Sequence, residues 1–142
     1  MLSFEDFKLT TPLSNALQDL GFIEPTPIQE AAFSVICSGK DVVGIAQTGT
    51  GKTLAYSLPL VRNLTYSTQE NPRILILVPT RELVVQVVDS LNKLNVYTNN
   101  RVLGVYGGTN INTQKRQIAE GIDILVATPG RLYDLALSNV LK

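Results

Sequence analysis

The chain has 142 residues, of which 44% are hydrophobic, and this size and content fit one compact domain with its own core. Twelve basic side chains balance twelve acidic ones, so no overall positive field attracts nucleic acid, and any such binding must depend on local contacts. Histidine is absent, which excludes histidine-ligated metals, Ser-His-Asp or Cys-His catalysis, and histidine as a general base.

The sequence also bears on disulfides and on membranes. Its one cysteine, Cys37, excludes an internal disulfide, points to a reducing compartment and is interpreted as a small core residue. The N-terminus has neither a basic nor an apolar leader segment, and no apolar run approaches the ~20 residues of a membrane span. We therefore expect a cytoplasmic protein, or a nuclear one in a eukaryote, without a membrane partner.

Two short amphipathic helices are predicted before residue 40, at 12–20 and 27–36, each preceded by threonine and ended by glycine. Thr26 caps the second helix, and Gln29 three residues later completes the pattern of a capping box. Gln29 therefore has a structural role open to it, in which its side chain accepts a hydrogen bond from the Thr26 N–H. Local sequence alone does not separate this role from a ligand-binding one.

An octapeptide with the pattern of a phosphate-binding loop follows, between an apolar strand predicted at 41–45 and a helix predicted from Leu54. Its glycines let consecutive N–H groups point inward, and the positive end of the helix dipole adds attraction for phosphate. Lys52 is placed to lie against the β- and γ-phosphates, and the Thr53 hydroxyl is a hard oxygen ligand suited to Mg²⁺. The loop consists of Ala46, Gln47, Thr48, Gly49, Thr50, Gly51, Lys52 and Thr53.

An alternative interpretation of this octapeptide is a glycine-rich strand-to-helix turn, capped by Thr48 or Thr50, that binds no phosphate. The helix that follows contains Pro59, which predicts a kink or an early end. The polar run 65–72 is then predicted to form an exposed loop, because nothing in it has the periodicity of a helix or strand.

Strands and helices alternate in the rest of the chain. Apolar strands are predicted at 73–78, 101–106 and 122–127, with helices at 83–94 and 111–119 and a last helix after 128–131. Right-handed crossovers then give an α/β fold with a parallel sheet covered on both faces. The loops after all four predicted strands fall at one edge of such a sheet, where ligands bind in this class of fold. These four loops are therefore predicted to contribute to a common functional site.

Five motifs in order carry a family resemblance. They are Gly21-Phe22 with Pro25–Gln29, Ala46–Thr53, Pro79–Leu83, Gly107-Gly108 and Thr128–Arg131, with Phe4 upstream. From Phe4 to Arg131 the chain resembles the first RecA-like domain of the DEAD-box ATP-dependent RNA helicases, with their Q motif and motifs I, Ia, GG and Ib. The resemblance implies a parallel-sheet, RecA-like P-loop NTPase domain, incomplete at the C-terminus, with a Q-motif region at 1–39 and a P-loop α/β core at 40–142. Val84 stands where the family usually has alanine, which concerns local packing.

The resemblance implies that the chain binds ATP with Mg²⁺. Gln29 would read adenine, because a side-chain amide offers one donor and one acceptor that match N7 and N6 of the base. Phe4 would pack against the base, although a hydrophobic clamp together with Phe7 is an alternative role. Lys52 and Thr53 would be the catalytic residues, and Thr53 the magnesium ligand. The implied nucleotide-binding set comprises Phe4, Phe22, Thr26, Gln29 and the whole loop 46–53.

The resemblance also implies that three loops hold the sugar–phosphate backbone of single-stranded RNA. Hydroxyls, helix N-terminal amides and arginines suit phosphates, and none of these groups reads a base, so binding would be independent of sequence and sensitive to salt. An alternative makes Thr80 and Thr128 helix caps, and Arg81 with Glu82 a surface ion pair. The implied RNA-binding residues are Pro79, Thr80, Arg81, Gly107, Gly108, Thr128, Pro129, Gly130 and Arg131.

The family's Asp-Glu-Ala-Asp motif does not occur before the chain stops at Lys142, and Asp123 opens a predicted strand rather than ending it. Phosphoryl transfer needs a carboxylate to hold Mg²⁺ and a group to orient water. We therefore expect part of an ATP-dependent RNA helicase that binds ATP and RNA but does not hydrolyse or unwind alone, with a second RecA-like domain as its partner. The alternatives are a non-catalytic nucleotide- or RNA-binding module and, against the motifs, another P-loop enzyme.

Overall fold

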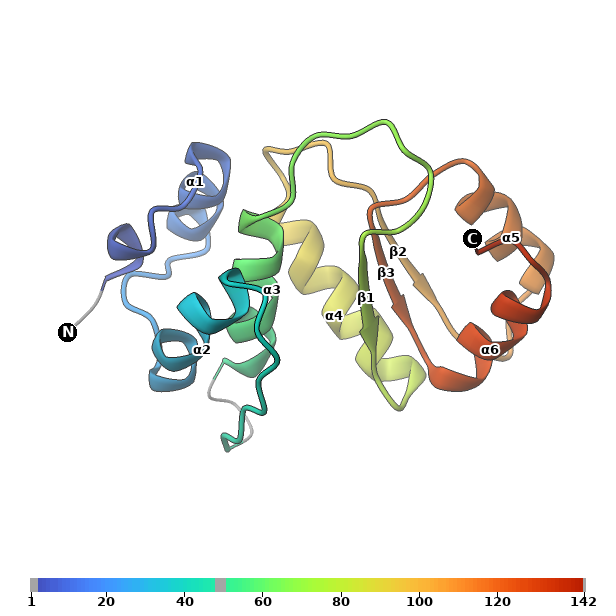
Figure 1. Ribbon diagram of the computed structural model, residues 1–142, viewed down its shortest axis with the longest axis horizontal. Coiled ribbons are helices and arrows are strands. Elements are labelled where there is room, and N and C mark those ends of the chain that lie inside the picture. The colour runs from blue at the N-terminus through green and yellow to red at the C-terminus, as the bar shows by residue number, and fades with distance from the viewer. Residues whose placement is uncertain (1–2, 48–50, 142) are drawn as a thin grey trace. The chain divides into compact units, whose positions relative to one another are not determined.

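The computed structural model describes residues 3–47 and 51–141, which form two compact units (Figure 1). One unit comprises Met1–Thr65 with Lys93–Thr98, and the other comprises Tyr66–Asn92 with Asn99–Lys142. Each unit has its own core and is considered by itself. No helix within the described residues is both long and apolar enough to cross a membrane.

In the first unit, the regular elements that the structure describes are all helices. A 3₁₀ helix, η1, covers Phe4–Phe7, and the α-helices are α1 (Thr11–Asp19), α2 (Pro27–Cys37) and α3 (Lys52–Arg62). The predicted helices at 12–20 and 27–36 are thus confirmed. α2 packs against α3, and the Phe7 and Phe33 rings stack with centroids 4.1 Å apart. The apolar core consists of Phe4, Phe7, Leu13, Ala16, Leu17, Ala32, Phe33, Ala55, Leu58 and Val61.

The helix that follows the phosphate-loop pattern differs from its prediction. It does not end early at Pro59 but runs on to Arg62. Pro59 is fully buried, and Leu58 and Val61 on either side of it are also in the core. Burial of these apolar side chains outweighs the backbone hydrogen bond that a proline in a helix forfeits.

A parallel sheet forms the centre of the second unit, with strands β1 (Ile74–Leu77), β2 (Val102–Val105) and β3 (Ile124–Ala127). The strand order is β1-β3-β2, so that β3 is central and all four of its residues are buried. The register places Ile124 opposite both Ile74 and Val102. Each strand is followed by a helix: α4 (Arg81–Leu94), α5 (Ile111–Ala119) and α6 (Pro129–Leu137). The α/β class and the parallel pairing are confirmed.

The helices lie on two sides of this sheet (Figure 1). α4 approaches one face so closely that a Cβ on Gly104 of β2 would lie 2.7 Å from Val84 and 2.8 Å from Val88. On the other face, buried side chains of β2, of β3 and of Ile122 just before β3 pack with α5 and α6. This cluster consists of Val105, Ile118, Ile122, Leu125, Ala127 and Leu135.

The strand predicted at 41–45 is not formed. Residues 41–47 have no regular secondary structure, and Val43 and Ile45 are 88% and 90% exposed. A strand needs a backbone partner, and every other regular element of the unit to which 41–45 belongs is a helix. The prediction of one sheet edge therefore holds for the loops after β1, β2 and β3, and not for the loop after residue 45.

A buried carboxylate joins the amino ends of the three strands. Asp123, 3% exposed and next to β3, accepts hydrogen bonds from Arg73 before β1 and from the backbone and side chain of Arg101 before β2. The donor–acceptor distances are 2.8–3.2 Å. Burial by itself raises the pKa of Asp123, but the hydrogen bonds and positive charge from the two arginines outweigh it, and the pKa is lowered.

Candidate functional sites

Gln29 joins the start of α2 to the start of α3. Its Oε1 accepts a hydrogen bond from the Thr26 N–H at 2.9 Å, and its Nε2 donates to the Gly51 carbonyl at 3.2 Å. One partner is a donor and the other an acceptor, so together they fix the orientation of the amide. The side chain is 4% exposed. Gln29 therefore serves as helix cap and as a tie to the residue that precedes Lys52.

The cap itself is one-sided. The Thr26 N–H is satisfied by Gln29, as the capping-box pattern predicts, but the approach of the Gln29 N–H to Thr26 Oγ1 is too loose to count as a hydrogen bond. Thr26 Oγ1 is buried and has no partner within the described residues. A buried hydroxyl without a partner lies beside the Gln29 amide.

In the described part of the phosphate-loop pattern, the glycine turn and the helix that follows it are formed, but the strand expected before the loop is not. Gly51 caps α3 with φ +84°, a left-handed conformation that favours glycine, and a Cβ there would lie 2.4 Å from Gln29 Nε2. Lys52 opens α3 and its side chain is exposed. The first-turn amides of α3 and this cation suit a phosphate group. Thr48, Gly49 and Thr50 lie outside the described residues; Ala46 and Gln47 precede them.

Thr53, the predicted magnesium ligand, is half-buried in the first turn of α3. Burial raises the pKa of Tyr56, and the neighbouring Thr53 hydroxyl opposes this rise. Among residues 3–47 and 51–141, no three acidic, histidine or cysteine side chains gather as a metal-ligand set. At this turn, the Thr53 hydroxyl is the oxygen that the described residues offer as a ligand to Mg²⁺.

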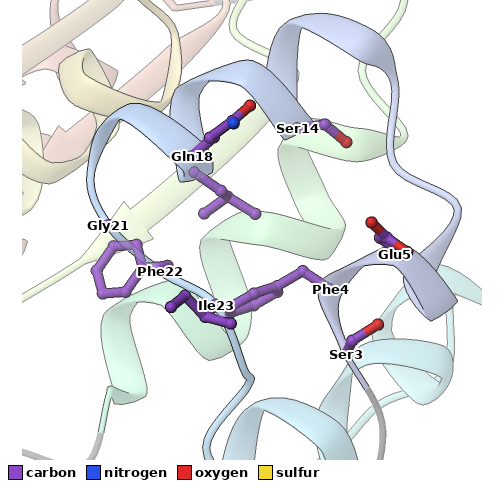
Figure 2. Close-up of a pocket in the computed structure, with 9 residues that line it drawn as sticks. Ser3, Phe4, Glu5, Ser14, Gln18, Gly21, Phe22 and Ile23 are labelled. Carbon is purple, nitrogen blue, oxygen red and sulfur yellow. The ribbon is translucent and has the colours of Figure 1, made fainter.

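Phe4 and Phe22 share a pocket of about 640 Å³ between η1, α1 and the segment after α1 (Figure 2). Phe4 is 7% exposed, with its ring edge-on to Phe7 and Phe22 at 5.8 and 6.5 Å, whereas Phe22 is 46% exposed. Figure 2 shows Gln18 and Ser14 of α1 on one side of the opening and Ser3 and Glu5 on the other. The pocket is thus lined by two aromatic rings together with polar side chains.

Three loops predicted to form one surface do follow the carboxyl ends of β1, β2 and β3. Pairing extends past the strands, since the Val78 N–H donates to Ala127 at 3.0 Å and the Thr128 N–H to Val105 at 3.2 Å. In the first loop, Thr80 Oγ1 accepts from the Leu83 N–H at 3.2 Å and so caps α4. Pro79, Thr80, Pro129 and Gly130 are exposed, and Thr128 is half-buried.

The double glycine after β2 is open to solvent. A Cβ added to Gly107, Gly108 or Gly130 would meet nothing within 4 Å, so a bound backbone can approach these positions closely. Gly108 has φ +79°, which favours glycine at this turn. Next to the turn, the Arg81 guanidinium lies over the Tyr106 ring, 5.0 Å from its centroid.

Arg131 points into its own unit, and its side chain is 9% exposed. Its Nη1 donates to Gln114 Oε1 at 2.7 Å, and Nη1 and Nη2 both donate to the Thr109 carbonyl at 3.2 Å. Gln114 in turn donates to Thr109 Oγ1 at 2.7 Å, and that hydroxyl donates to the Tyr106 carbonyl at 2.8 Å. Arg131 is thus brought together with the double-glycine loop.

Sequence reasoning did not single out Gln114 or Tyr106. A signal for Gln114 was present, because it occupies the same helical stripe as Ile111 and Ile118, and a glutamine on an apolar stripe calls for a buried partner. Tyr106 was counted as a strand end, and nothing in the sequence shows that its ring lies under Arg81.

A parallel three-stranded α/β unit with its loops at the carboxyl edge, and a glycine-capped helix opening on a lysine, define the class of RecA-like domains. A family model described as DEAD/DEAH box helicase matches residues 26–142, so the chain belongs to that family. A solved structure of a hypothetical ATP-dependent RNA helicase from Sulfolobus tokodaii is similar, with a TM-score of 0.83 and 34% identity. The match covers 94% of this chain and 38% of that one.

Relatives by sequence bear helicase names. "ATP-dependent RNA helicase DeaD" of Buchnera aphidicola is 41% identical over 98% of this chain, and the protein of that name in Escherichia coli K12 is 44% identical over 93%. The human "Probable ATP-dependent RNA helicase DDX27" is 44% identical over 94% of the chain. The chain spans 24%, 21% and 18% of the lengths of these three relatives.

Proposed function

We propose that this chain is part of an ATP-dependent RNA helicase and supplies an ATP site and a surface for single-stranded RNA. The nucleotide would lie at Gln29, Gly51 and Lys52, and the RNA backbone along the loops after β1, β2 and β3. The observation that carries the proposal is the bond from Gln29 to the Gly51 carbonyl, because it joins the adenine-reading candidate to the phosphate-binding turn. Family membership and the names of the relatives support it.

Capping and adenine reading are compatible roles for Gln29. An amide oxygen has two lone pairs and an amide nitrogen two hydrogens, and the described bonds use one of each. The remaining lone pair can accept from adenine N6, and the remaining hydrogen can be donated to N7. Guanine presents the opposite pattern at the first of these positions, so we expect ATP to be preferred to GTP.

The phosphates would lie at the amino end of α3. Lys52 would supply an exposed positive charge there, Gly51 gives the turn its left-handed conformation beside Gln29, and the Thr53 hydroxyl would hold Mg²⁺ together with phosphate oxygens. The metal supplies charge neutralisation for the phosphates when it is bound. In a protein of the relatives' length, we propose that ATP-driven unwinding involves a second RecA-like domain.

RNA would be held by its backbone and not by its bases. The open glycines admit a sugar–phosphate chain, and the amino ends of α4 and α6 present amides and the Thr80 and Thr128 hydroxyls. Arg81 is exposed and supplies charge. We expect affinity to depend on salt and to differ little between oligouridine and oligoadenosine.

Calorimetric titration of the folded chain with Mg-ATP and, separately, Mg-GTP tests the nucleotide half of the proposal. Selective binding of ATP is expected, and equal binding of both nucleotides, or of neither, would count against it. Fluorescence anisotropy with labelled oligouridine at several salt concentrations tests the RNA half. Affinity that does not change with salt, or no binding by the folded chain, would contradict the backbone surface.

A further inference from the structure

We propose that Gln114 is a positioning residue that holds the double-glycine loop and Arg131 together as one RNA-binding unit. The effect on RNA rests on the proposed RNA surface. The ordering of the loop by Gln114 depends only on contacts within this chain. Gln114 lies on α5 with 7% of its surface exposed. It contacts no nucleic acid in this role and acts through the residues that it holds.

Both ends of the Gln114 amide are engaged with elements of the surface. Oε1 accepts from Arg131 Nη1 at 2.7 Å, and Nε2 donates to Thr109 Oγ1 at 2.7 Å and lies 3.5 Å from the Tyr106 carbonyl. An amide that donates at one end and accepts at the other can bridge a guanidinium and a loop, which no apolar side chain of this size can do. A buried arginine without such a partner would be costly.

The charge of Arg131 is directed inward. Two of its nitrogens donate to the Thr109 carbonyl, Nη1 also donates to Gln114, and Nε lies 3.9 Å from Asp134 Oδ2. With 9% of the side chain exposed, little of the guanidinium faces solvent. Arg131 therefore affects RNA chiefly by fixing the shape of the loop at 107–109.

The loop itself has little else to hold it. Gly107 and Gly108 have no side chains, nothing packs where their Cβ atoms would be, and Gly108 adopts a positive φ. The described hydrogen bonds of Thr109 run to Tyr106, Gln114 and Arg131. A loop fixed before binding does not lose its conformational freedom when RNA arrives, so the network should raise affinity.

The same network reaches the loop after β1. The Tyr106 carbonyl accepts from Thr109 while the Tyr106 ring lies under Arg81. One residue therefore contacts the network by its backbone and the exposed arginine of the neighbouring loop by its side chain. The three loops are thus joined by contacts within one unit. Among the described side chains that make these contacts, Gln114 is the only buried amide.

Gln114→Met tests the inference, because methionine keeps the length of the side chain and removes both hydrogen-bonding ends. The matched control is Gln117→Met, on the exposed side of the same helix. We expect Gln114→Met to weaken binding of labelled oligouridine by about tenfold, because the loop and the Arg131 side chain must then be ordered when RNA binds. Mg-ATP affinity should not change, and the control should bind both ligands as the unaltered chain does.

Two further variants separate positioning from a general loss of fold. Gln114→Glu keeps an acceptor for Arg131, and the Thr109 hydroxyl can turn to donate to it, so affinity should return to within about threefold of the original. Thr109→Val, at an exposed site, removes only the hydroxyl link and should weaken oligouridine binding by about threefold. If Gln114→Met binds oligouridine normally, or Gln114→Glu is equally weak, the inference is wrong.

Amide hydrogen exchange measured without RNA tests the ordering of the loop independently of the proposed RNA binding. Exchange at Gly108, Thr109 and Asn110 should become faster in Gln114→Met than in Gln117→Met. If the folded chain binds no oligouridine, the proposed RNA surface fails, and the exchange comparison still decides whether Gln114 orders the loop. Unchanged exchange in Gln114→Met overturns the inference whatever the RNA result.

Discussion

The two units position their loops by different means. In the second unit, three loops continue from paired strands, and backbone hydrogen bonds extend past the strand ends to Val78 and Thr128. In the first unit, the loop before α3 follows the unpaired segment 41–47, and a side-chain bond from Gln29 to Gly51 ties it to α2. Backbone pairing tolerates most substitutions, whereas a side-chain tie is lost with one.

The cations of the two units differ in the same way. Lys52 is exposed at a helix start, whereas Arg131 is buried against Gln114 and Arg81 lies over Tyr106. A basic residue in a motif can thus serve the ligand directly or serve the loop that the ligand meets. Exposure and internal partners distinguish these uses, and sequence does not. Variants of exposed and of internally bonded residues should therefore differ in whether they lower ligand affinity or stability.

The largest effect is expected at the amino end of the sheet. Asp123→Ala removes the acceptor of Arg73 and Arg101, and breaking a buried ion pair costs about 3–5 kcal/mol. Because the Arg101 side chain is 36% exposed, we expect about 3 kcal/mol lower unfolding free energy in urea titrations. The control Asp134→Ala, at a carboxylate 55% exposed, should lower it by less than about 0.5 kcal/mol.

The ion pairs of Asp123 with Arg73 and Arg101 also predict how stability depends on pH. The pKa of Asp123 is lower in the folded chain than its ordinary value of 3.8, so ionised Asp123 stabilises the fold above that value. This stabilisation is lost as the pH falls from about 4 through the lower folded pKa. Urea titrations across this range should show a smaller acid-induced decline for Asp123→Ala than for the unaltered chain. Parallel declines would show that the carboxylate is not the group responsible.

A smaller effect, on binding and not on stability, is expected at the exposed cation of the first unit. Lys52→Ala removes the charged donor that we propose binds phosphate, and such a hydrogen bond is worth about 2 kcal/mol, or roughly 30-fold in the affinity for Mg-ATP. The melting temperature should not change, because the Lys52 side chain is exposed. Lys40→Ala, at another exposed lysine of the same unit, is the control in calorimetry. Equal affinities for the two variants would refute a phosphate role for Lys52.

Gln29→Glu separates the capping role of Gln29 from its bond to Gly51 and its proposed contact with adenine. Glutamate still accepts from the Thr26 N–H, so the cap is kept, but it cannot donate to the Gly51 carbonyl or to adenine N7. We expect Mg-ATP affinity to fall about tenfold, the preference over GTP to shrink, and amide exchange at Lys52 to become faster. Gln29→Ala should in addition lower the unfolding free energy by about 1 kcal/mol. Stability loss without a change in selectivity would leave Gln29 a cap alone.

Sequence patterns predicted the local structure well. Helix spacing at 27–36 and 111–119 and apolar runs at 73–78 and 122–127 depend on neighbours in the chain, and these elements formed. The apolar run 41–45 suits a strand equally well but has no pairing partner among the described residues of its unit, and a pattern cannot show whether a partner exists. The early end predicted as one outcome at Pro59 did not occur, because core packing, which is tertiary, favours the continued helix.

In the candidate sites too, contacts between near neighbours in the sequence were predictable, and contacts between distant residues were not. The capping bond of Gln29 joins residues three apart, and its pattern was visible; the bond to Gly51 joins residues 22 apart, and nothing local foretold it. The loops after the three strands were placed correctly because parallel strands share one carboxyl edge. The inward direction of Arg131 depends on Gln114, 17 residues earlier, and only the folded chain reveals it.

The smallest effect is expected at Tyr106. Tyr106→Leu removes the ring beneath Arg81, an exposed cation–π contact worth about 0.5–1 kcal/mol, and keeps the carbonyl that accepts from Thr109. Oligouridine affinity should fall by about two- to fourfold, because Arg81 must then be ordered by the RNA itself. Tyr106→Phe keeps the ring and should bind as the unaltered chain does. If phenylalanine weakens binding as much as leucine, the hydroxyl and not the ring matters, and the exposed arginine of the second unit is not held as described.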